Sequence, residues 1–139
     1  MWVVEHLNRY PMQFKELFMN GRKGGNLRAN QFIYREATDT DGQKPVIVLN
    51  QEGDIGKYNR ANRSLTHFLE NAIPFVAALP INFFLYPLPT FILACSYFIG
   101  RIVHQTGYAN GGWGSHGLGF LIVMFATQIM VGLMIIAYI

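Results

Sequence analysis

Charge is what the second half of this sequence lacks. After Glu70, the only side chain expected to be ionised at neutral pH is Arg101, although the chain continues to residue 139. Only 14% of all residues are charged, whereas a soluble domain usually carries about a quarter. Such a half could not cover the surface of a soluble fold, but a bilayer tolerates apolar surface and penalises charge. The sequence therefore predicts an integral membrane protein in contact with membrane lipid.

Cysteine is almost absent as well, since Cys95 is the only one. An intrachain disulfide is therefore excluded, and the apolar run around Cys95 predicts a packing role for it. Residues 1–20 do not resemble a signal peptide, because charges and a proline interrupt their apolar stretch. The net charge of +3 is small and lies in the polar half, which suits a membrane surface better than nucleic acid.

Composition divides the chain into three segments. Residues 1–20 mix apolar and charged side chains in a pattern typical of an amphipathic or interfacial helix, or of the end of a first membrane helix. Residues 21–57 are polar and punctuated by glycine, which predicts a surface loop with a short strand or extended segment at Pro45–Leu49. Residues 58–139 are predicted to form a transmembrane helix bundle.

Three apolar stretches of the last segment predict membrane spans, at about 68–88, 90–108 and 117–139. About 20 helical residues cross the hydrocarbon core, so the second and third stretches are long enough. The first is expected to begin earlier, near Lys57, and its prolines are tolerated where neighbouring groups satisfy the freed carbonyls. We therefore expect an all-α integral membrane fold with three clear spans.

Basic residues predict the orientation of these spans. Ten of the eleven Lys and Arg residues lie at or before Arg63. Because basic loops stay on the cytoplasmic side, we expect loop 21–57 to face the cytoplasm or its equivalent. The loop 109–116 returns to the same side, which places Arg63, His104 and His116 at one membrane depth. The endoplasmic reticulum, mitochondrial and plastid membranes are all compatible with this pattern.

Polar residues around the start of the first span share one helix face. Arg63, His67 and Glu70 are spaced i, i+4 and i+7. A carboxylate at the start of an apolar run needs a cationic partner or a hydrogen-bond donor. This face therefore predicts either a ligand site or an interfacial charge pair that fixes the helix register.

The second span carries a similar stripe. Tyr97, Arg101, His104 and Tyr108 are spaced i, i+4, i+7 and i+11. An arginine at a membrane interface can clamp a carboxylate, either that of Glu70 or that of a ligand. The alternative interpretation is that Arg101 extends to the lipid headgroups.

Two other kinds of site are less favoured. His67 and His104, on different helices, could ligate haem, but no further residue supports a haem or metal site. The glycine-rich run Gly107–Gly119 follows no strand and lacks a Gly-Lys-Ser/Thr ending, so it does not match a phosphate loop. It predicts a flexible turn between helices.

Two motifs resemble those of the MAPEG family, the membrane-associated proteins in eicosanoid and glutathione metabolism. The segment Arg60–Phe75 is similar to the signature helix of that family, with its arginine-rich turn, its Glu and a following Pro-Phe pair. Arg101–Tyr108 is similar to the motif at the end of the third family helix. The resemblance covers roughly residues 21–139. It implies a four-helix subunit whose first helix is truncated or missing in this sequence.

The resemblance also implies a homotrimer that binds glutathione between subunits, near the cytosolic face. Site residues are carried over position by position. His67 stands where the family usually has Asn, three residues before the Glu, and is kept among the glutathione-binding candidates. The other candidates, which match family glutathione contacts or the second motif, are Arg63, Glu70, Arg101, His104 and Tyr108.

The thiolate-activating residue of the family is not matched. After its Gly-Tyr motif the family usually carries an arginine, whereas residues 113–117 here are Trp-Gly-Ser-His-Gly. His116 is the nearest catalytic candidate, although a neutral imidazole is a poorer thiolate partner than a guanidinium group. Ser115 is a second candidate, because its hydroxyl could donate a hydrogen bond.

Three functions follow from these observations. The first is a membrane enzyme of the microsomal glutathione transferase or peroxidase type that acts on lipophilic electrophiles. The second is a non-catalytic MAPEG-derived structural subunit of a larger membrane complex. The third is a lipid- or haem-binding membrane module. The enzyme would form its own trimer, whereas the structural subunit would purify only within a larger assembly.

Overall fold

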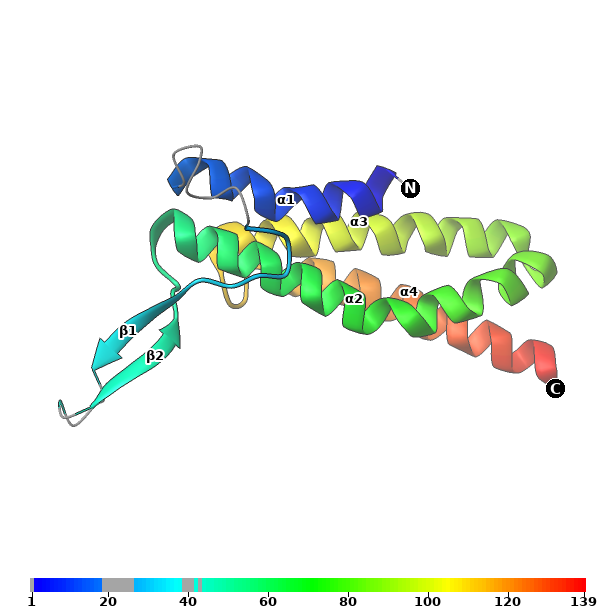
Figure 1. Ribbon diagram of the computed structural model, residues 1–139. Coiled ribbons are helices and arrows are strands. Elements are labelled where there is room, and N and C mark those ends of the chain that lie inside the picture. Colours follow the sequence, from blue (N-terminus) through cyan, green and yellow to red (C-terminus); the bar gives the residue numbers. More distant parts are fainter. Residues whose placement is uncertain (1, 19–26, 39–41, 43) are drawn as a thin grey trace. The chain divides into compact units, whose positions relative to one another are not determined.

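The computed structural model describes residues 2–18, 27–38, 42 and 44–139 and divides into two compact units (Figure 1). The N-terminal unit covers residues 1–65 and the C-terminal unit covers residues 66–139. The boundary lies inside a helix, eight residues after the predicted start of the helix bundle at residue 58. The elements along the chain are α1 (Trp2–Phe18), β1 (Tyr34–Thr38), β2 (Pro45–Leu49), α2 (Gly53–Leu85), α3 (Pro87–Gly111) and α4 (Gly117–Tyr138).

Helix α1 has two different faces. Leu7 and Tyr10 are buried, whereas the ion pair between Arg9 and Glu5 is exposed on the opposite side. The Tyr10 ring meets the edge of the Phe14 ring, with 5.3 Å between the ring centroids. Apolar residues spaced three and four apart therefore bury one stripe of the helix, as expected for an amphipathic segment.

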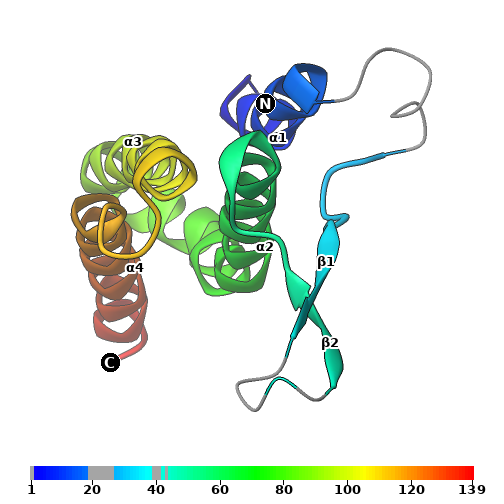
Figure 2. The ribbon, with the colours of Figure 1, turned by 90° about the vertical axis from the view of Figure 1, so that its left-hand side faces the viewer.

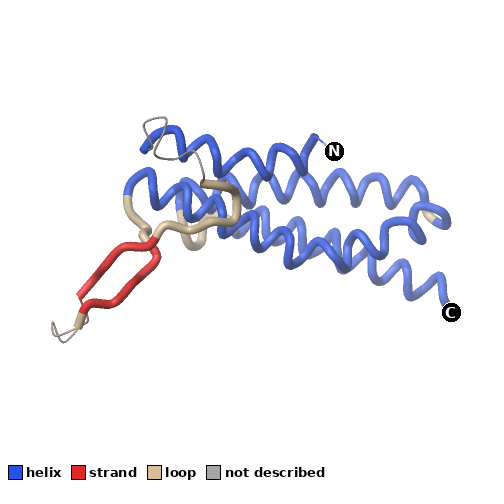
Figure 3. Tube along the Cα trace, in the orientation of Figure 1, coloured by secondary structure: helices blue, strands red, loops and turns tan. Residues whose placement is uncertain are grey.

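The segment 21–57 is not only loop, because it contains a β-hairpin (Figure 3). Strands β1 and β2 pair antiparallel, with Tyr34 opposite Leu49 and Thr38 opposite Pro45. Strand β2 coincides with the apolar run noted in the sequence. Strand β1 was missed, because its sequence Tyr-Arg-Glu-Ala-Thr is polar and largely exposed and so shows no clear alternation.

Asn59 of α2 fastens the base of this hairpin. Its Oδ1 accepts a hydrogen bond from the Ile33 backbone N–H at 2.9 Å. Its Nδ2 donates to the carbonyl oxygens of Ile33 and Asn50, both at 2.7 Å. The side chain is fully buried. A single amide thus bonds three half-buried backbone groups beside the hairpin, of which the Ile33 carbonyl also accepts from the Asn50 N–H at 3.1 Å.

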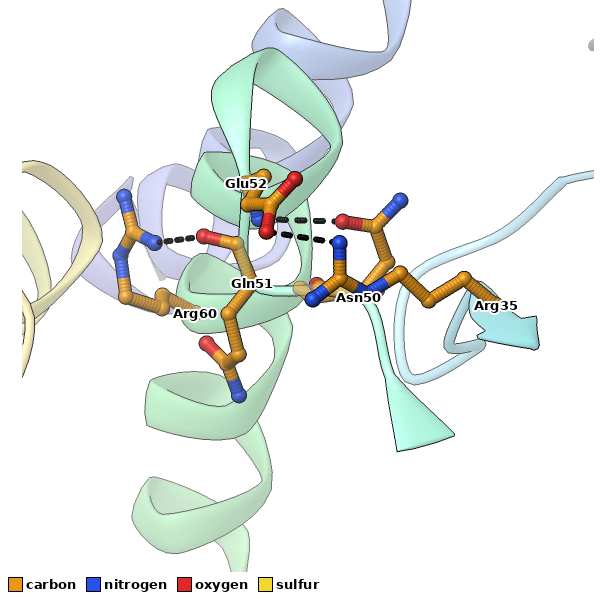
Figure 4. Close-up of polar contacts among 6 residues, drawn as sticks. Arg35, Asn50, Gln51, Glu52 and Arg60 are labelled. Carbon is orange, nitrogen blue, oxygen red and sulfur yellow. Dashed lines mark hydrogen bonds and ion pairs between the residues drawn. The ribbon is translucent and has the colours of Figure 1, made fainter. Parts of the chain in front are cut away.

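Figure 4 shows how the chain enters α2 just beyond the hairpin. The Glu52 backbone N–H donates to Asn50 Oδ1 at 3.0 Å, and Arg60 Nη1 donates to the Gln51 carbonyl at 2.8 Å. The Glu52 carboxylate pairs with Arg35 of β1 at 2.6 Å. Polar side chains from the strand, the connection and the first helical turns therefore define where α2 begins.

The C-terminal unit contains residues 66–85 of α2 together with α3 and α4. The chain reverses at Tyr86, which precedes Pro87 at the first turn of α3. A proline disfavours helical geometry in the residue before it and is well suited to the first turn of a new helix. Helices α3 and α4 then lie side by side (Figure 2).

The glycine-rich run Gly107–Gly119 is not all turn, although the predicted span from about residue 117 begins where α4 does. Helix α3 continues to Gly111 and α4 begins at Gly117, so the turn is restricted to residues 112–116. Gly112 has a φ of 74°, a conformation that favours glycine. Gly119 lies within α4, where a Cβ atom would overlap the backbone of His104. These glycines therefore stop one helix and allow close packing of the next, two roles that sequence alone does not distinguish.

Helices α2 and α4 are the two helices in the described ranges that are long and apolar enough to cross a membrane. Only 22% and 17% of their most apolar stretches are buried within the chain, so most of those side chains face outward. The core helix of a soluble protein would be mostly buried. The third predicted span, 90–108, lies inside α3. This helix carries Arg101, His104 and Gln105 and does not meet the same criterion of length and apolar composition. A third crossing stays a prediction.

Candidate functional site

Five polar side chains of the C-terminal unit meet at one end of α3 and form what we term the polar cluster. Helix α2 contributes His67, and α3 contributes Arg101, His104 and Tyr108. The turn between α3 and α4 contributes His116. Each member contacts at least one other member through a hydrogen bond or a ring contact. The structure therefore brings together five of the eight site residues predicted from the sequence.

Arg101 is the buried cation of the cluster, with only 1% of its surface exposed. Its Nη1 lies 3.2 Å from Nδ1 of His67, and its guanidinium carbon lies 5.2 Å from the centroid of the Phe68 ring. Because a guanidinium group only donates, Nδ1 of His67 must be the acceptor. A neutral His67 therefore carries its proton on Nε2. The ring of Phe68 supplies a cation–π contact to the same charge.

His104 connects the two ends of the cluster. Its ring stacks on that of His67, with centroids 5.1 Å apart and planes inclined by 6°. The ring of His116 meets it edge-on at 5.0 Å. The close approach of Gly119 to the His104 backbone lets α4 come near enough for His116, just before α4, to reach this ring. The position of His104 thus depends on helix packing as well as on its own side chain.

His116 lies among aromatic rings. Its ring meets that of Tyr108 nearly at right angles, with centroids 5.1 Å apart, and that of Trp113 at 5.5 Å. Its Nδ1 is buried and makes no hydrogen bond within the part of the chain that the structure describes. An imidazole nitrogen in these surroundings can accept a proton from a group that enters the cluster.

Three predicted site residues lie outside the polar cluster. Glu70 is exposed on α2, in contrast to the buried Arg101 that was considered as its partner. Arg63 is exposed and belongs to the N-terminal unit. Ser115 is exposed on the turn before His116. A contribution of these three to the same site stays a prediction.

The arrangement of the imidazoles does not favour haem or another metal. The lone pairs of an imidazole lie in the plane of its ring. Because the rings of His67 and His104 are stacked with nearly parallel planes, their nitrogens do not converge on one metal ion. His67 also uses Nδ1 to accept from Arg101. Within the described residues, no group of three or more His, Cys, Asp or Glu side chains has metal-binding geometry.

The sequence model of the MAPEG family matches residues 25–138. The chain belongs to the MAPEG family. The match contains both sequence motifs and the whole polar cluster. No curated protein and no solved structure matches the chain significantly. Membership of this helical membrane family, together with the apolar helices α2 and α4, makes the protein an integral membrane protein.

The sequence analysis did not single out every residue that supports the cluster, although Phe68 and Phe75 both lie within the first motif. Phe68 and Phe75 are both buried on α2, where they contact Arg101 and Tyr97 respectively. Their spacing of seven residues is a signal for one helix face, but it is common to any packed helix. The sequence did not indicate a packing role for Gly119, because a glycine in an apolar helix can have several roles. The sequence therefore indicated the polar members of the site and missed their support.

The geometry of the polar cluster defines what it can do chemically. Arg101 offers a buried positive charge that can hold an anionic group. Tyr108 offers a phenolic hydroxyl that can donate or accept a hydrogen bond. His116 offers an imidazole nitrogen that can accept a proton, and His104 offers a second imidazole for hydrogen bonding. A site with these groups suits a small anionic molecule that must also lose a proton.

Proposed function

We propose that this MAPEG protein is a glutathione-dependent membrane enzyme of the microsomal transferase or peroxidase type, acting on lipophilic electrophiles. The observation that carries the proposal is the polar cluster itself. A buried guanidinium group and three imidazoles are costly in the apolar setting of the C-terminal unit. Such residues within membrane helices usually mark a functional site rather than packing.

Glutathione fits the donor set of the cluster. It carries two carboxylates, one amino group and one thiol, so it needs a cation, a hydrogen-bonding hydroxyl and a proton acceptor. Arg101, Tyr108 and His116 are residues of these three kinds. The family resemblance adds Arg63 for a carboxylate and Glu70 for the amino group. His104 would contact the bound peptide, and His67 would hold Arg101 in place through Nδ1.

In the transfer reaction, His116 takes the proton of the glutathione thiol, since the thiolate is the nucleophile. A carbon–sulfur bond forms at the electrophilic carbon while a leaving group departs, or while an added proton completes an addition. Arg101 holds a glutathione carboxylate through its positive charge and so orients the thiol toward His116. In the peroxidase reaction, two glutathione molecules reduce a hydroperoxide to an alcohol and water and become the disulfide.

The proposed enzyme is a homotrimer with α3 as a third membrane crossing and loop 21–57 on the cytoplasmic side. Arg63 and Glu70 are charged and exposed on α2, which suits a site completed by a neighbouring subunit. The apolar side chains exposed on α4, such as Phe125 and Ile136, suit contact with lipid or with another subunit. These features are those that the family resemblance implies.

A structural subunit of a larger membrane complex is the second candidate. His67 replaces the usual Asn, and it is already engaged with Arg101 at 3.2 Å. No arginine follows Tyr108 to stabilise a thiolate. In this case Arg101, His67 and Phe68 would serve only to fasten α2 to α3.

Calorimetry on the detergent-solubilised protein separates the two candidates. We expect saturable glutathione binding by the native chain, and weaker binding by Arg101→Gln, because that variant removes the charge. The thiolate of bound glutathione, followed by its ultraviolet absorbance, should decrease in His116→Phe. The rate of conjugation to 1-chloro-2,4-dinitrobenzene should fall in the same variant by about a hundredfold, the lower end of the range for loss of a general base.

Two comparisons make this test specific. Ser115→Ala should reduce the rate less than His116→Phe, because Ser115 offers no proton acceptor of similar basicity. Thr127→Val serves as the matched control, since that hydroxyl donates to the Val123 carbonyl within α4 at 2.9 Å and lies about three helical turns beyond His116. Absence of glutathione binding by the native chain up to millimolar concentration would reject the enzyme and leave the structural subunit.

A further inference from the structure

Tyr97 lies one helical turn before Arg101 on α3 and is held by aromatic rings. Its ring stacks on Phe75 of α2, with centroids 3.8 Å apart and planes inclined by 8°. The ring of Phe98 meets it edge-on at 5.6 Å. Only 1% of the residue is exposed. The direction of the hydroxyl is therefore determined by packing on both sides.

The hydroxyl of Tyr97 is not explained by that packing. A phenylalanine would make the same ring contacts. The oxygen is buried and makes no hydrogen bond to any residue in the ranges that the structure describes. Burying a hydroxyl without a partner costs free energy, and the cost is larger in apolar surroundings. A ligand oxygen that bonded this hydroxyl would remove the cost.

Arg101 indicates which ligand chemistry fits beside this hydroxyl. Tyr97 and Arg101 are spaced i, i+4 on α3 and interact electrostatically. Both groups can donate hydrogen bonds, and the guanidinium group carries a positive charge. A neighbouring pair of donors with a positive charge recognises a carboxylate, because each carboxylate oxygen can accept from a different donor.

We propose that Tyr97 is a further binding residue of the glutathione site, donating its hydroxyl to a glutathione carboxylate that Arg101 also holds. This inference rests on the proposed function. Tyr97 and Arg101 are about 6 Å apart along the axis of α3, given the helical rise per residue, so the bound carboxylate would lie between the two side chains. Tyr97 thereby selects ligands that carry a carboxylate at that end over ligands that lack one.

The test compares two proteins with three ligands by calorimetry on the full chain in detergent. The proteins are the native chain and Tyr97→Phe, which keeps the ring stacked on Phe75. The ligands are glutathione, its glycyl monoethyl ester, and 4-aminobutyryl-cysteinyl-glycine, which lacks the glutamyl carboxylate. We expect Tyr97→Phe to bind glutathione roughly tenfold more weakly, as for loss of a hydrogen bond to a charged group.

The analogues decide whether the hydroxyl touches a carboxylate. For one of the two analogues, the native chain and Tyr97→Phe should bind with equal affinity. In that analogue, the carboxylate that accepts from the Tyr97 hydroxyl is already esterified or absent. For the other analogue the tenfold difference should persist. Tyr138→Phe is the matched control, since that tyrosine is 93% exposed at the end of α4 and should leave all affinities unchanged.

The other results overturn the inference in distinguishable ways. If the native chain binds glutathione and Tyr97→Phe binds it equally well, Tyr97 is not part of the site although the proposed function stands. If Tyr97→Phe weakens all three ligands equally and also lowers the unfolding temperature, the hydroxyl has a structural role only. If the native chain does not bind glutathione, both the inference and the proposed function fail.

Discussion

Buried amides hold the N-terminal unit together, whereas rings and one guanidinium group meet inside the C-terminal unit. Asn59 and Asn62 both bond backbone groups of the segment before β1, with Asn62 Nδ2 donating to the Gln31 carbonyl at 2.9 Å. In the C-terminal unit His67, Arg101 and His104 instead contact one another. The buried amides Asn59 and Asn62 therefore serve the backbone, whereas the side chains of the polar cluster contact one another.

The difference follows from which groups satisfy the backbone N–H and carbonyl groups in each unit. The segment 27–33 is irregular, so its N–H and carbonyl groups need partners from elsewhere, and α2 supplies them. Helices satisfy their own backbone, which is why they are suited to lipid. Polar side chains in the C-terminal unit are therefore available for a ligand, and this is the physical reason to look for function there.

The largest expected loss of stability comes from a substitution at Gly119, because this glycine contacts the His104 backbone in the C-terminal unit. A Cβ atom at Gly119 would overlap backbone atoms of α3, which cannot move aside as a side chain can. Gly119→Ala should lower the free energy of unfolding by about 3 kcal/mol, the upper end of typical overpacking costs. Thermal unfolding in detergent measures this loss.

A matched glycine on the same helix is the control. A Cβ atom at Gly132 would meet nothing within 4 Å. Gly132→Ala should therefore leave stability unchanged or raise it by up to about 1 kcal/mol, since alanine favours helix. Equal stability of the two variants would show that α3 and α4 do not pack as closely as described.

Loss of the Asn59 amide should break the N-terminal unit with a smaller effect. Asn59→Ala removes three hydrogen bonds and leaves backbone groups of Ile33 and Asn50 without them. We expect a loss of about 2 kcal/mol, because the half-buried Ile33 N–H and Asn50 carbonyl lose this partner together, whereas the Ile33 carbonyl keeps the bond from the Asn50 N–H. Hydrogen exchange of the β1 and β2 amides should accelerate, whereas exchange in α4 should not change.

Asn110→Ala is the control for this prediction. Asn110 is exposed on α3 and donates to the Thr106 carbonyl at 2.9 Å, so its removal should have little effect. If Asn59→Ala left the exchange of the hairpin unchanged, the amide would not be what fastens it.

The smallest expected effect concerns Asn82, which sharpens the comparison because it is a buried amide in the C-terminal unit. Its Nδ2 donates to the Met130 carbonyl on α4 at 2.7 Å. That carbonyl lies within a helix that already supplies it with a bond, so no backbone group depends on Asn82. Asn82→Ala should cost about 1 kcal/mol, in the range for hydrogen bonds between membrane helices.

The apolar variant Asn82→Leu should be no less stable than Asn82→Ala, because it restores buried volume in the same place. Thermal unfolding of both variants in detergent measures the difference. A loss for Asn82→Ala as large as that for Asn59→Ala would contradict the distinction between the two units.

Several features of this protein were determined by the sequence alone. The absence of charge after Glu70 predicted membrane helices, and α2 and α4 lie where the apolar runs indicated. Two motifs with a defined order and spacing predicted the MAPEG family, which the family match confirmed over residues 25–138. These inferences succeeded because they depend on composition and local periodicity, which a sequence contains directly.

Only the tertiary structure decided which residues meet. Helical spacing placed His67 on one stripe and Arg101 on another, but it could not predict that they share a hydrogen bond at 3.2 Å. It could not show that Gly119 contacts the His104 backbone, or that the buried Tyr97 hydroxyl makes no hydrogen bond to the residues that the structure describes. Periodicity determines the face of a helix on which a side chain lies, whereas its neighbours depend on how distant segments pack.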